Sequence, residues 1–270
     1  MKVNWVIENF TKEVSYLEMA EAVKRQGHDL LELNGGYSKA DLDPIRNTKA
    51  PVMFLGSIGM TRLIKEELAH LSPVAFCSFS NYLCQRYYPK YAHHGLLFND
   101  NIVWTLACQF LAKKFFYYSI FAKEAILFVR PDSGEKPFQA QLLDLQDVDS
   151  FSKKVNPDEF IVLSSPKNIM GEWRFVVSNK PEIISYSCYR FQGQVTKVPG
   201  APQGAIDKCW EVLKVGYYPD PVFVIDICED SDGNYWLLEL NSFSSAGLYA
   251  CNKDKIVERV SEIACSHKNT

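Results

Sequence analysis

The chain has 270 residues, of which 47% are hydrophobic and 23% charged, and its formal net charge is −3. This size and balance predict one large or two modest soluble domains with a substantial core. They exclude the strongly basic surface that marks nucleic-acid binding, and no apolar run is long enough to span a membrane. The first ten residues lack a basic segment and a small-residue cleavage site, so we expect no signal peptide.

Eight cysteines are spread along the chain without a C-x-x-C pair or zinc-finger spacing. Several lie inside apolar runs, such as Cys108 in WTLACQF and Cys228 in VIDIC. We therefore expect small buried thiols in a reducing cytoplasm rather than disulfides or a structural metal.

The first third of the chain predicts strands that alternate with helices, which favours a small open sheet flanked by helices. The strands are expected at residues 3–7, 29–33 and 51–55, and the helices at residues 15–26 and 60–70. Residues 71–97 are irregular and rich in Tyr, Phe and Cys. A long helix is then expected from Asn99 or Asp100 to about residue 122.

After residue 124 short strands dominate the pattern. Single strands are expected at residues 125–130, 138–145 and 160–163, and hairpins at 172–177 with 182–189 and at 222–228 with 235–240. Further helices are expected near residue 150, at 205–215 and from Asn252 to Cys265. No low-complexity linker separates the first region, of alternating strands and helices, from the strand-rich region. We therefore expect the domain boundary somewhere near residues 113–123.

The second hairpin, VFVIDICEDSDGNYWLLELN, carries the sharpest signal. Asp232 and Gly233 favour a two-residue turn, because a type I′ turn needs positive φ at both central positions. Counting outward from that turn places Asp226 directly opposite Glu239, with Asn241 on the same face. The other face would carry four core residues: Ile225, Ile227, Leu238 and Leu240.

This register brings two carboxylates to within ~5 Å of each other at Cβ. A hard divalent cation would remove their repulsion, and Mg²⁺ takes one or two carboxylates together with phosphate oxygens. The alternative is a solvent-facing polar stripe, although Tyr235 and Leu237 would share its face. Pattern alone leaves both interpretations open.

Basic residues lie upstream in two places. Arg130 and Lys136 flank the loop RPDSGEK, which follows a strand directly and whose small residues would let backbone amides approach an anion. An ordinary hairpin loop is the alternative, and no Walker A motif is present. Arg174 lies inside the apolar strand GEWRFVV, where a buried guanidinium needs a phosphate or a carboxylate such as Glu172. Arg190, which closes the next strand, raises the same question.

Taken in chain order, these segments resemble the ATP-grasp superfamily. IDICEDSDGNYWLLELN resembles its terminal metal hairpin, an acid followed by E-x-N. GEWRFVVSNKPEIISYSCYR resembles its preceding hairpin, an E-x-R strand followed by a strand that ends in Tyr-Arg. FVRPDSGEKPF resembles the clade named for two arginines and a lysine. The resemblance spans about residues 125–249.

The resemblance implies an α/β (α+β) fold, in which a two-lobe ATP-grasp domain follows a small open-sheet substrate lobe. The substrate lobe would span residues 1–112 and the ATP-grasp domain residues 113–270, divided into a small lobe at 113–163 and a large lobe at 164–270. The front turn from Gly56 to Gly59 opens a helix, so its amides are candidates for a substrate carboxylate. Arg62 on that helix and Arg86 are further candidates.

The resemblance also implies roles for named residues. Asp226, Glu239 and Asn241 would bind Mg²⁺, or Mn²⁺, between the phosphates of ATP. The other implied residues are Arg130 and Lys136 at the phosphates, Glu172 at the nucleotide, Arg174 and Arg190 as catalytic residues at the γ-phosphate or acyl phosphate, and Val162, Leu163, Ser164 and Ser165 as the strand whose backbone reads adenine. The sequence departs from the family in lacking its Gly-rich phosphate loop and the usual carboxylate or amide near Ser164 and Ser165.

The implied activity is an ATP-dependent ligase that joins a carboxylate to an amine through an acyl phosphate. Such chemistry needs positioning and charge neutralisation rather than a nucleophilic side chain. The alternatives are a phosphotransferase on the same fold and a non-catalytic nucleotide-binding module. We expect small-molecule substrates, no nucleic-acid or membrane partner and a cytoplasmic location; the sequence does not indicate the oligomeric state or the two substrates.

Overall fold

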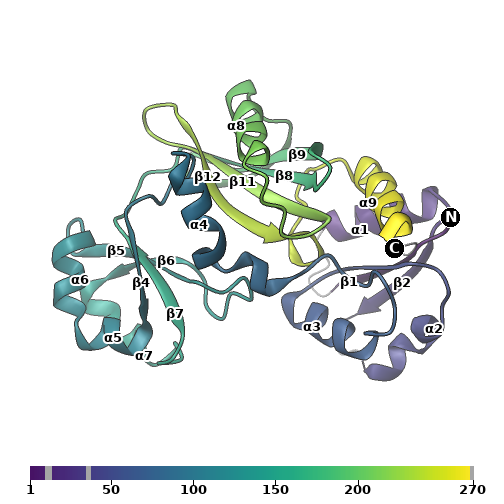
Figure 1. Cartoon of the computed structure of the whole chain (residues 1–270), viewed down its shortest axis with the longest axis horizontal. Helices are drawn as coiled ribbons and strands as arrows, with labels where there is room; N and C mark the ends of the chain where they lie inside the picture. Colours follow the sequence, from purple (N-terminus) through teal and green to yellow (C-terminus); the bar gives the residue numbers. More distant parts are fainter. Residues whose placement is uncertain (10–13, 35–37, 268–270) are drawn as a thin grey trace.

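The structure is a computed structural model, and it describes residues 1–9, 14–34 and 38–267. Three sheets are arranged along the long axis of the molecule (Figure 1). We call them the front sheet, the small sheet and the large sheet. In this part of the chain, no helix is long and apolar enough to cross a membrane.

The front sheet is parallel, with strand order β2-β1-β3. Its elements are β1 (Asn4–Asn9), α1 (Val14–Arg25), β2 (Asp29–Asn34), α2 (Asp43–Arg46), β3 (Val52–Leu55) and α3 (Ile58–Glu67). Alternate side chains of β1 point to opposite faces: Trp5 and Ile7 pack toward α1 and α9, while Val6 packs toward α2 and α3. The expected strands and helices of this region are confirmed.

The small sheet is antiparallel, with strand order β4-β7-β5-β6. Its elements are β4 (Ile102–Leu106), α5 (Ala107–Ala112), α6 (Lys114–Phe121), β5 (Ile126–Pro131), β6 (Gln141–Asp144), α7 (Val148–Ser152) and β7 (Phe160–Ser164). The three helices cover one face and enclose a separate core that includes Phe110, Leu127 and Leu163. The opposite face carries Arg130 and Val162, which are register partners.

The large sheet is also antiparallel, with strand order β10-β9-β8-β11-β12. Its elements are β8 (Gly171–Ser178), β9 (Glu182–Phe191), β10 (Gln194–Pro199), α8 (Gln203–Lys214), β11 (Val222–Glu229), β12 (Tyr235–Ser242), the 3₁₀ segment η4 (Phe243–Ser245) and α9 (Lys253–His267). One face packs Phe175 and Ile225 with α8 and with tyrosines of α4. On the other face, Val176 and Val224 share a core with α1, α9 and the front sheet.

Two expectations about helices were wrong. Residues 84–93 form α4 (Cys84–His93), which lies between the small and large sheets (Figure 1). The long helix expected from residue 99 to 122 is instead strand β4 followed by α5 and α6, because β4 pairs with β7 along its whole length. The small sheet thus takes in a strand from before the expected boundary at residues 112 and 113; the division into lobes at the stated positions stays a prediction.

The β11–β12 hairpin reaches the expected pairing by a different route. Its turn is longer than two residues, with the Asp230 amide donating to the Asn234 carbonyl, so Glu229 pairs with Tyr235. A bulge at Leu238 then shifts the register, and Asp226 lies opposite Glu239 as expected. The bulge exchanges two residues relative to the expectation: Leu237 is buried in the core, and Leu238 lines the cleft.

Candidate active site

Six of the expected site residues form one hydrogen-bonded cluster between the small and large sheets: Arg130, Lys136, Arg174, Asp226, Glu239 and Asn241. They come from β5, the loop after it, β8, β11 and β12. The register explains their meeting, because Asp226 pairs with Arg174 on one side and with Glu239 on the other. Three cations therefore face two carboxylates and one amide.

Asp226 and Arg174 form a bidentate ion pair in the centre of the large sheet. Arg174 Nε donates to Asp226 Oδ1 at 2.9 Å, and Arg174 Nη2 donates to Oδ2 at 2.7 Å. Asp226 is fully buried, and Asn241 Nδ2 also donates to its Oδ2 at 2.9 Å. Arg174 Nη1 donates to the carbonyl of Gly247 at 2.7 Å. This planar, bidentate geometry is the kind in which a buried guanidinium is stable.

Lys136 and Arg130 converge on Glu239. Lys136 Nζ donates to Asn241 Oδ1 at 2.7 Å and to Glu239 Oε1 at 3.2 Å, and Arg130 Nη2 donates to Glu239 Oε2 at 3.2 Å. Burial acts to raise the pKa of Glu239, but the charges of Lys136 and Arg130 outweigh it and hold that pKa well below its usual range. Glu239 is therefore a carboxylate across the physiological pH range.

The loop that carries Lys136 is fastened at several points. The buried Asp132 accepts hydrogen bonds from the first amides of α4, at Cys84 and Gln85 (3.0 and 2.8 Å). Gly134 packs so closely on Tyr82 that an added Cβ would meet the Tyr82 Cβ at 2.6 Å. Lys136 itself adopts a φ of 49°, in the left-handed region that a non-glycine residue enters at a cost.

The donor set fits a divalent cation bound together with phosphates. Within the described residues no three His, Cys, Asp or Glu side chains gather into a metal cluster. Two carboxylates and an amide are nevertheless a set that Mg²⁺ accepts when phosphate oxygens complete its coordination. The Lys136 ammonium lies between Glu239 and Asn241, so a cation already occupies the position between these oxygen ligands.

Arg190 and Glu172 form a neighbouring pair rather than part of the central cluster. Arg190 Nε lies 3.3 Å from Glu172 Oε1, and the Arg190 side chain is about half exposed. Burial raises the pKa of Glu172, although hydrogen bonding from Tyr189 and the charge of Arg190 act in the opposite direction. Both residues line a pocket of about 300 Å³ between the two sheets, together with Phe128, Leu142, Ser165 and Leu238.

The four residues of the expected adenine-reading strand are divided between two environments. Val162 packs with the tyrosines of α4, and Leu163 packs on the opposite side, in the core of the small sheet. Ser164 pairs with Phe128 and is fully buried, and its hydroxyl has no hydrogen-bond partner in the described structure. Ser165 lines the cleft pocket.

Sequence reasoning missed the aromatic residues that hold two of the arginines. Tyr189 and Tyr249 stack with ring centroids 4.9 Å apart, and the Arg174 guanidinium lies 5.3 and 4.9 Å from their centroids. The Tyr88 hydroxyl accepts a hydrogen bond from Arg130 Nη1 at 3.0 Å. The Tyr-Arg pair near the end of β9 was a visible signal for Tyr189, whereas nothing in the sequence placed Tyr249 beside Arg174.

The front turn is already partly occupied by protein groups. The Ser57 amide donates to Glu8 Oε2 at 2.6 Å, and the Ser57 hydroxyl accepts from the Met60 amide, which caps α3. The Gly56 amide donates to the Ser244 carbonyl in η4, just beyond Asn241. The turn thus joins the front sheet to the end of β12. Arg62 of α3 forms an ion pair with Glu135 of the Lys136 loop at 2.5 Å.

Solved structures with the same fold cover nearly the whole chain. D-cycloserine synthetase DcsG matches with a TM-score of 0.63 at 12% identity, over 96% of this chain and 99% of that one. D-alanine–D-alanine ligase from Bacillus anthracis, complexed with ATP, matches with a TM-score of 0.61 at 12% identity, over 100% and 97%. The ATP-grasp ligase PsnB, complexed with a minimal precursor, matches with a TM-score of 0.59 at 13% identity, over 97% and 100%.

At these identities the likeness establishes the fold, and it confirms the expected α/β ATP-grasp architecture. A search of curated proteins returned no match. Residues 110–259 match the family described as ATP-grasp domain, R2K clade family 2. Because this match covers more than half of the chain, the protein belongs to the R2K clade of ATP-grasp domains.

Proposed function

We propose that the protein is a Mg²⁺- and ATP-dependent ligase that joins a carboxylate to an amine and releases ADP and phosphate. The observation that carries the proposal is the convergence of Arg130, Lys136 and Arg174 on the acid and amide oxygens of the β11–β12 hairpin. A cluster with more cations than carboxylates suits a ligand that brings phosphates and a divalent ion together.

Each side chain has a role that its position supports. Glu239 and Asn241 hold the Mg²⁺, which neutralises charge on the phosphates when bound. Asp226 orients Arg174, because both of its oxygens already accept hydrogen bonds from that guanidinium, and it completes the set of metal ligands. Lys136 and Arg130 bind phosphate oxygens, and Arg174 faces the transferred phosphoryl group.

The neighbouring pocket is where we place the rest of the nucleotide. Phe128, Leu142 and Leu238 supply apolar surfaces for a base, and Ser165, the last of residues 162–165, lines the same pocket. Glu172 and Arg190 line the same pocket. We therefore assign Glu172 to nucleotide binding, and Arg190 to the phosphates where the triphosphate extends out of the pocket. The carboxylate would be activated as an acyl phosphate, with the front sheet presenting the substrate.

Nucleotide binding is the first test. Titration of a non-hydrolysable ATP analogue in the presence of Mg²⁺ should show saturable binding to the wild type and at least about a tenfold weaker affinity for Glu239→Gln and Lys136→Met. Lys180→Met, which replaces an exposed lysine in the β8–β9 turn, is the matched control. Equal affinity in all four proteins would refute the assignment of these residues.

Product analysis is the second test. The protein is incubated with ATP and pooled amino acids, or with a metabolite extract, and the products are identified by mass spectrometry. An amide or peptide whose formation depends on Glu239 supports the ligase. A stable phosphorylated product would show a phosphotransferase instead, and nucleotide binding without any product over both pools would favour a binding module.

A further inference from the structure

The three cations of the central cluster differ in how firmly the protein holds them. The side chains of Arg130 and Arg174 are 7% and 8% exposed. Their guanidinium groups also donate outside the cluster, to the Tyr88 hydroxyl and the Gly247 carbonyl. The side chain of Lys136 is 37% exposed, and its ammonium reaches the cluster on a flexible stem. Lys136 is therefore the cation that can leave the cluster most easily.

The Lys136 ammonium lies among the oxygens that we assign to the metal. Its Nζ is 2.7 Å from Asn241 Oδ1, and 3.2 and 3.4 Å from the two carboxylate oxygens of Glu239. Glu239 Oε2 also accepts a hydrogen bond from the buried Arg130. An ammonium and a Mg²⁺ ion bind the same oxygen atoms. A metal ion can therefore take up these ligands only after Lys136 has left them.

The charge of the cluster decides what can displace this lysine. Three cations face two carboxylates, so the cluster carries one excess positive charge. A free divalent cation would meet like charge in a largely buried site, where screening is weak. A metal ion that arrives with a nucleoside triphosphate brings an excess of negative charge instead. Its phosphate oxygens also give the ammonium a new charged partner, which compensates for the contacts that it loses.

We propose that Lys136 makes the site selective for a metal–nucleotide complex over the free metal ion, an inference that rests on the proposed function. The ammonium holds the metal position until a triphosphate binds it, and Glu239 and Asn241 are then available to the metal. The substitution Lys136→Met therefore acts in opposite directions on the two ligands. It weakens the binding of nucleotide and strengthens the binding of free metal.

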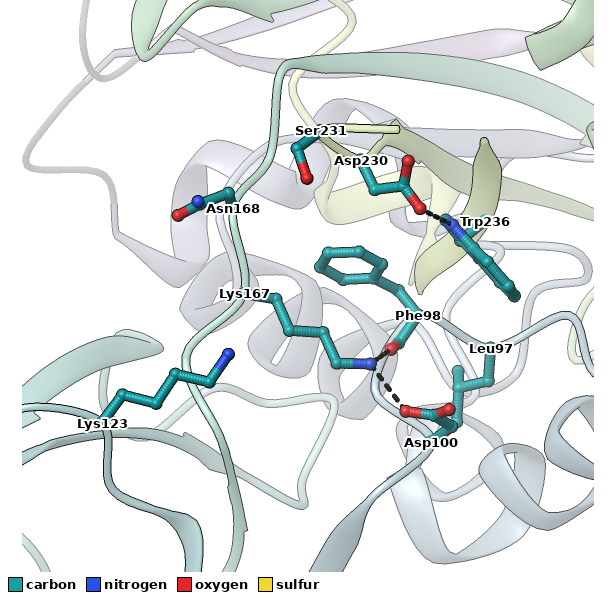
Figure 2. A pocket seen from close by; sticks show the side chains of 9 residues that line it. All are labelled: Leu97, Phe98, Asp100, Lys123, Lys167, Asn168, Asp230, Ser231 and Trp236. Atoms are coloured by element: carbon teal, nitrogen blue, oxygen red, sulfur yellow. Dashed lines mark hydrogen bonds and ion pairs between the residues drawn. The ribbon is translucent and has the colours of Figure 1, made fainter. Parts of the chain in front are cut away.

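A second lysine that is paired with oxygens provides the comparison. Lys167 lies in one of the two linkers that join the small sheet to the rest of the protein, residues 97–101 and 165–170. Its ammonium donates to Asp100 Oδ1 at 2.6 Å and to the Phe98 carbonyl (Figure 2). The Asp100 side chain is 67% exposed, so the loss of Lys167 would leave a solvated carboxylate rather than a largely buried set of ligands. Lys167→Met is therefore the matched control.

Titration of Mn²⁺ into the full chain without nucleotide tests the proposal, with free Mn²⁺ followed by electron paramagnetic resonance. We expect weak binding by the wild type and by Lys167→Met. Lys136→Met should bind Mn²⁺ at least about tenfold more tightly, because a unit charge beside the ligands is removed. Lys136→Arg keeps that charge and should bind as weakly as the wild type. Adding Glu239→Gln to Lys136→Met should abolish the gain. Thermal unfolding checks that each variant is folded.

The outcomes separate this role of Lys136 from the proposed function. Equal Mn²⁺ affinity in Lys136→Met and Lys167→Met would overturn the proposal, as would a gain that persists without the Glu239 carboxylate, because the ion would then bind elsewhere. A wild type that binds no ATP analogue would refute the proposed function. The Mn²⁺ titrations contain no nucleotide, so they would still decide whether Lys136 excludes the free metal ion.

Discussion

The front sheet and the small sheet flank the same large sheet but attach to it in different ways. The front sheet shares one continuous core with the large sheet, in which Trp5 packs with α9, Val176 and Val224. The small sheet encloses its own core under α5, α6 and α7, and it meets the rest of the protein through α4, two linkers and the polar cluster. The front and large sheets therefore share a core, and we expect them to respond to mutation as one body, separately from the small sheet.

The largest effect is expected from Trp5→Ala, which tests whether the front and large sheets share one core. Trp5 is fully buried, and its Nε1 donates to Ser261 Oγ of α9 at 3.1 Å. The loss of a buried Trp should lower the free energy of unfolding by about 3–5 kcal/mol. Hydrogen exchange should accelerate in α9 and β11 as well as in the front strands. Acceleration confined to residues before 70 would mean that the two sheets are independent.

A smaller and local effect is expected from Phe110→Ala. Phe110 is fully buried in the core of the small sheet, so its truncation should cost about 3 kcal/mol. Faster hydrogen exchange should stay within residues 102–164. The exposed Phe115 of neighbouring α6 provides the matched control, since its replacement by Ala removes the same ring from solvent. Equal exchange changes in β1 would contradict a separate core.

Asp220 tests which body the segment before α4 belongs to. Its carboxylate accepts from the Ser78 amide (3.0 Å), the Ser78 hydroxyl (2.7 Å) and the Tyr82 hydroxyl (2.6 Å). Asp220→Ala leaves these donors without a partner and should cost about 1–3 kcal/mol, measured by urea unfolding. If the variant showed fast hydrogen exchange at residues 78–82 without any loss of global stability, this segment would not belong to the same folding unit as the large sheet.

The same carboxyl gives a pH dependence. Burial raises the pKa of Asp220 above its ordinary value of 3.8, against the opposing effect of its hydrogen bonds. A raised folded-state pKa gives stability that is present below pH 3.8 and is lost as the pH rises through the folded-state value. Over that range the wild type should lose stability relative to Asp220→Ala; a difference that stays constant with pH would contradict the burial of this charge.

The smallest effect is expected from Arg62→Ala. The Arg62–Glu135 ion pair joins the front lobe to the loop that carries Lys136, but both side chains are substantially exposed. Its loss should change stability by about 1 kcal/mol or less and nucleotide affinity by a few-fold. The charge-reversed pair Arg62→Glu with Glu135→Arg should restore the affinity. Arg25→Ala, which breaks another exposed pair, serves as the control.

Local sequence patterns predicted much of the fold, and they identified the residues that form the central cluster. The alternation of Asp226, Glu239 and Asn241 placed them on one face, and the register is the expected one even though a bulge and a longer turn produce it. The two deviations cancel, since each shifts the pairing by one residue. A turn signal such as Asp-Gly predicts that a hairpin exists but not how its strands bulge.

Of the features that sequence analysis missed, α4 carries a recognisable pattern, whereas β4 and the position of Tyr249 depend on contacts that are distant in the sequence. The buried residues of α4 are Cys84, Tyr87, Tyr88 and Tyr91, which is the spacing of a helix, but Pro89 inside it disguised the pattern. Residues 102–106 form a strand because they pair with β7, which lies more than 50 residues away in the sequence. The position of Tyr249 beside Arg174 depends on the same kind of distant contact, which one sequence does not reveal.

Strand β12 forms a shared wall for three parts of the molecule. Trp236 donates to the Asp230 carboxylate at the hairpin tip, and Leu238 and Glu239 face the cleft. The Ser244 carbonyl, just after the strand, accepts from the Gly56 amide of the front turn. Consecutive residues of a strand advance by about 3.3 Å, so the geometry of β12 fixes the distances between these three sets of contacts. An insertion in the turn at residues 230–234 would alter the hairpin tip alone, whereas one extra residue between Leu237 and Ser242 would change the spacing of all three.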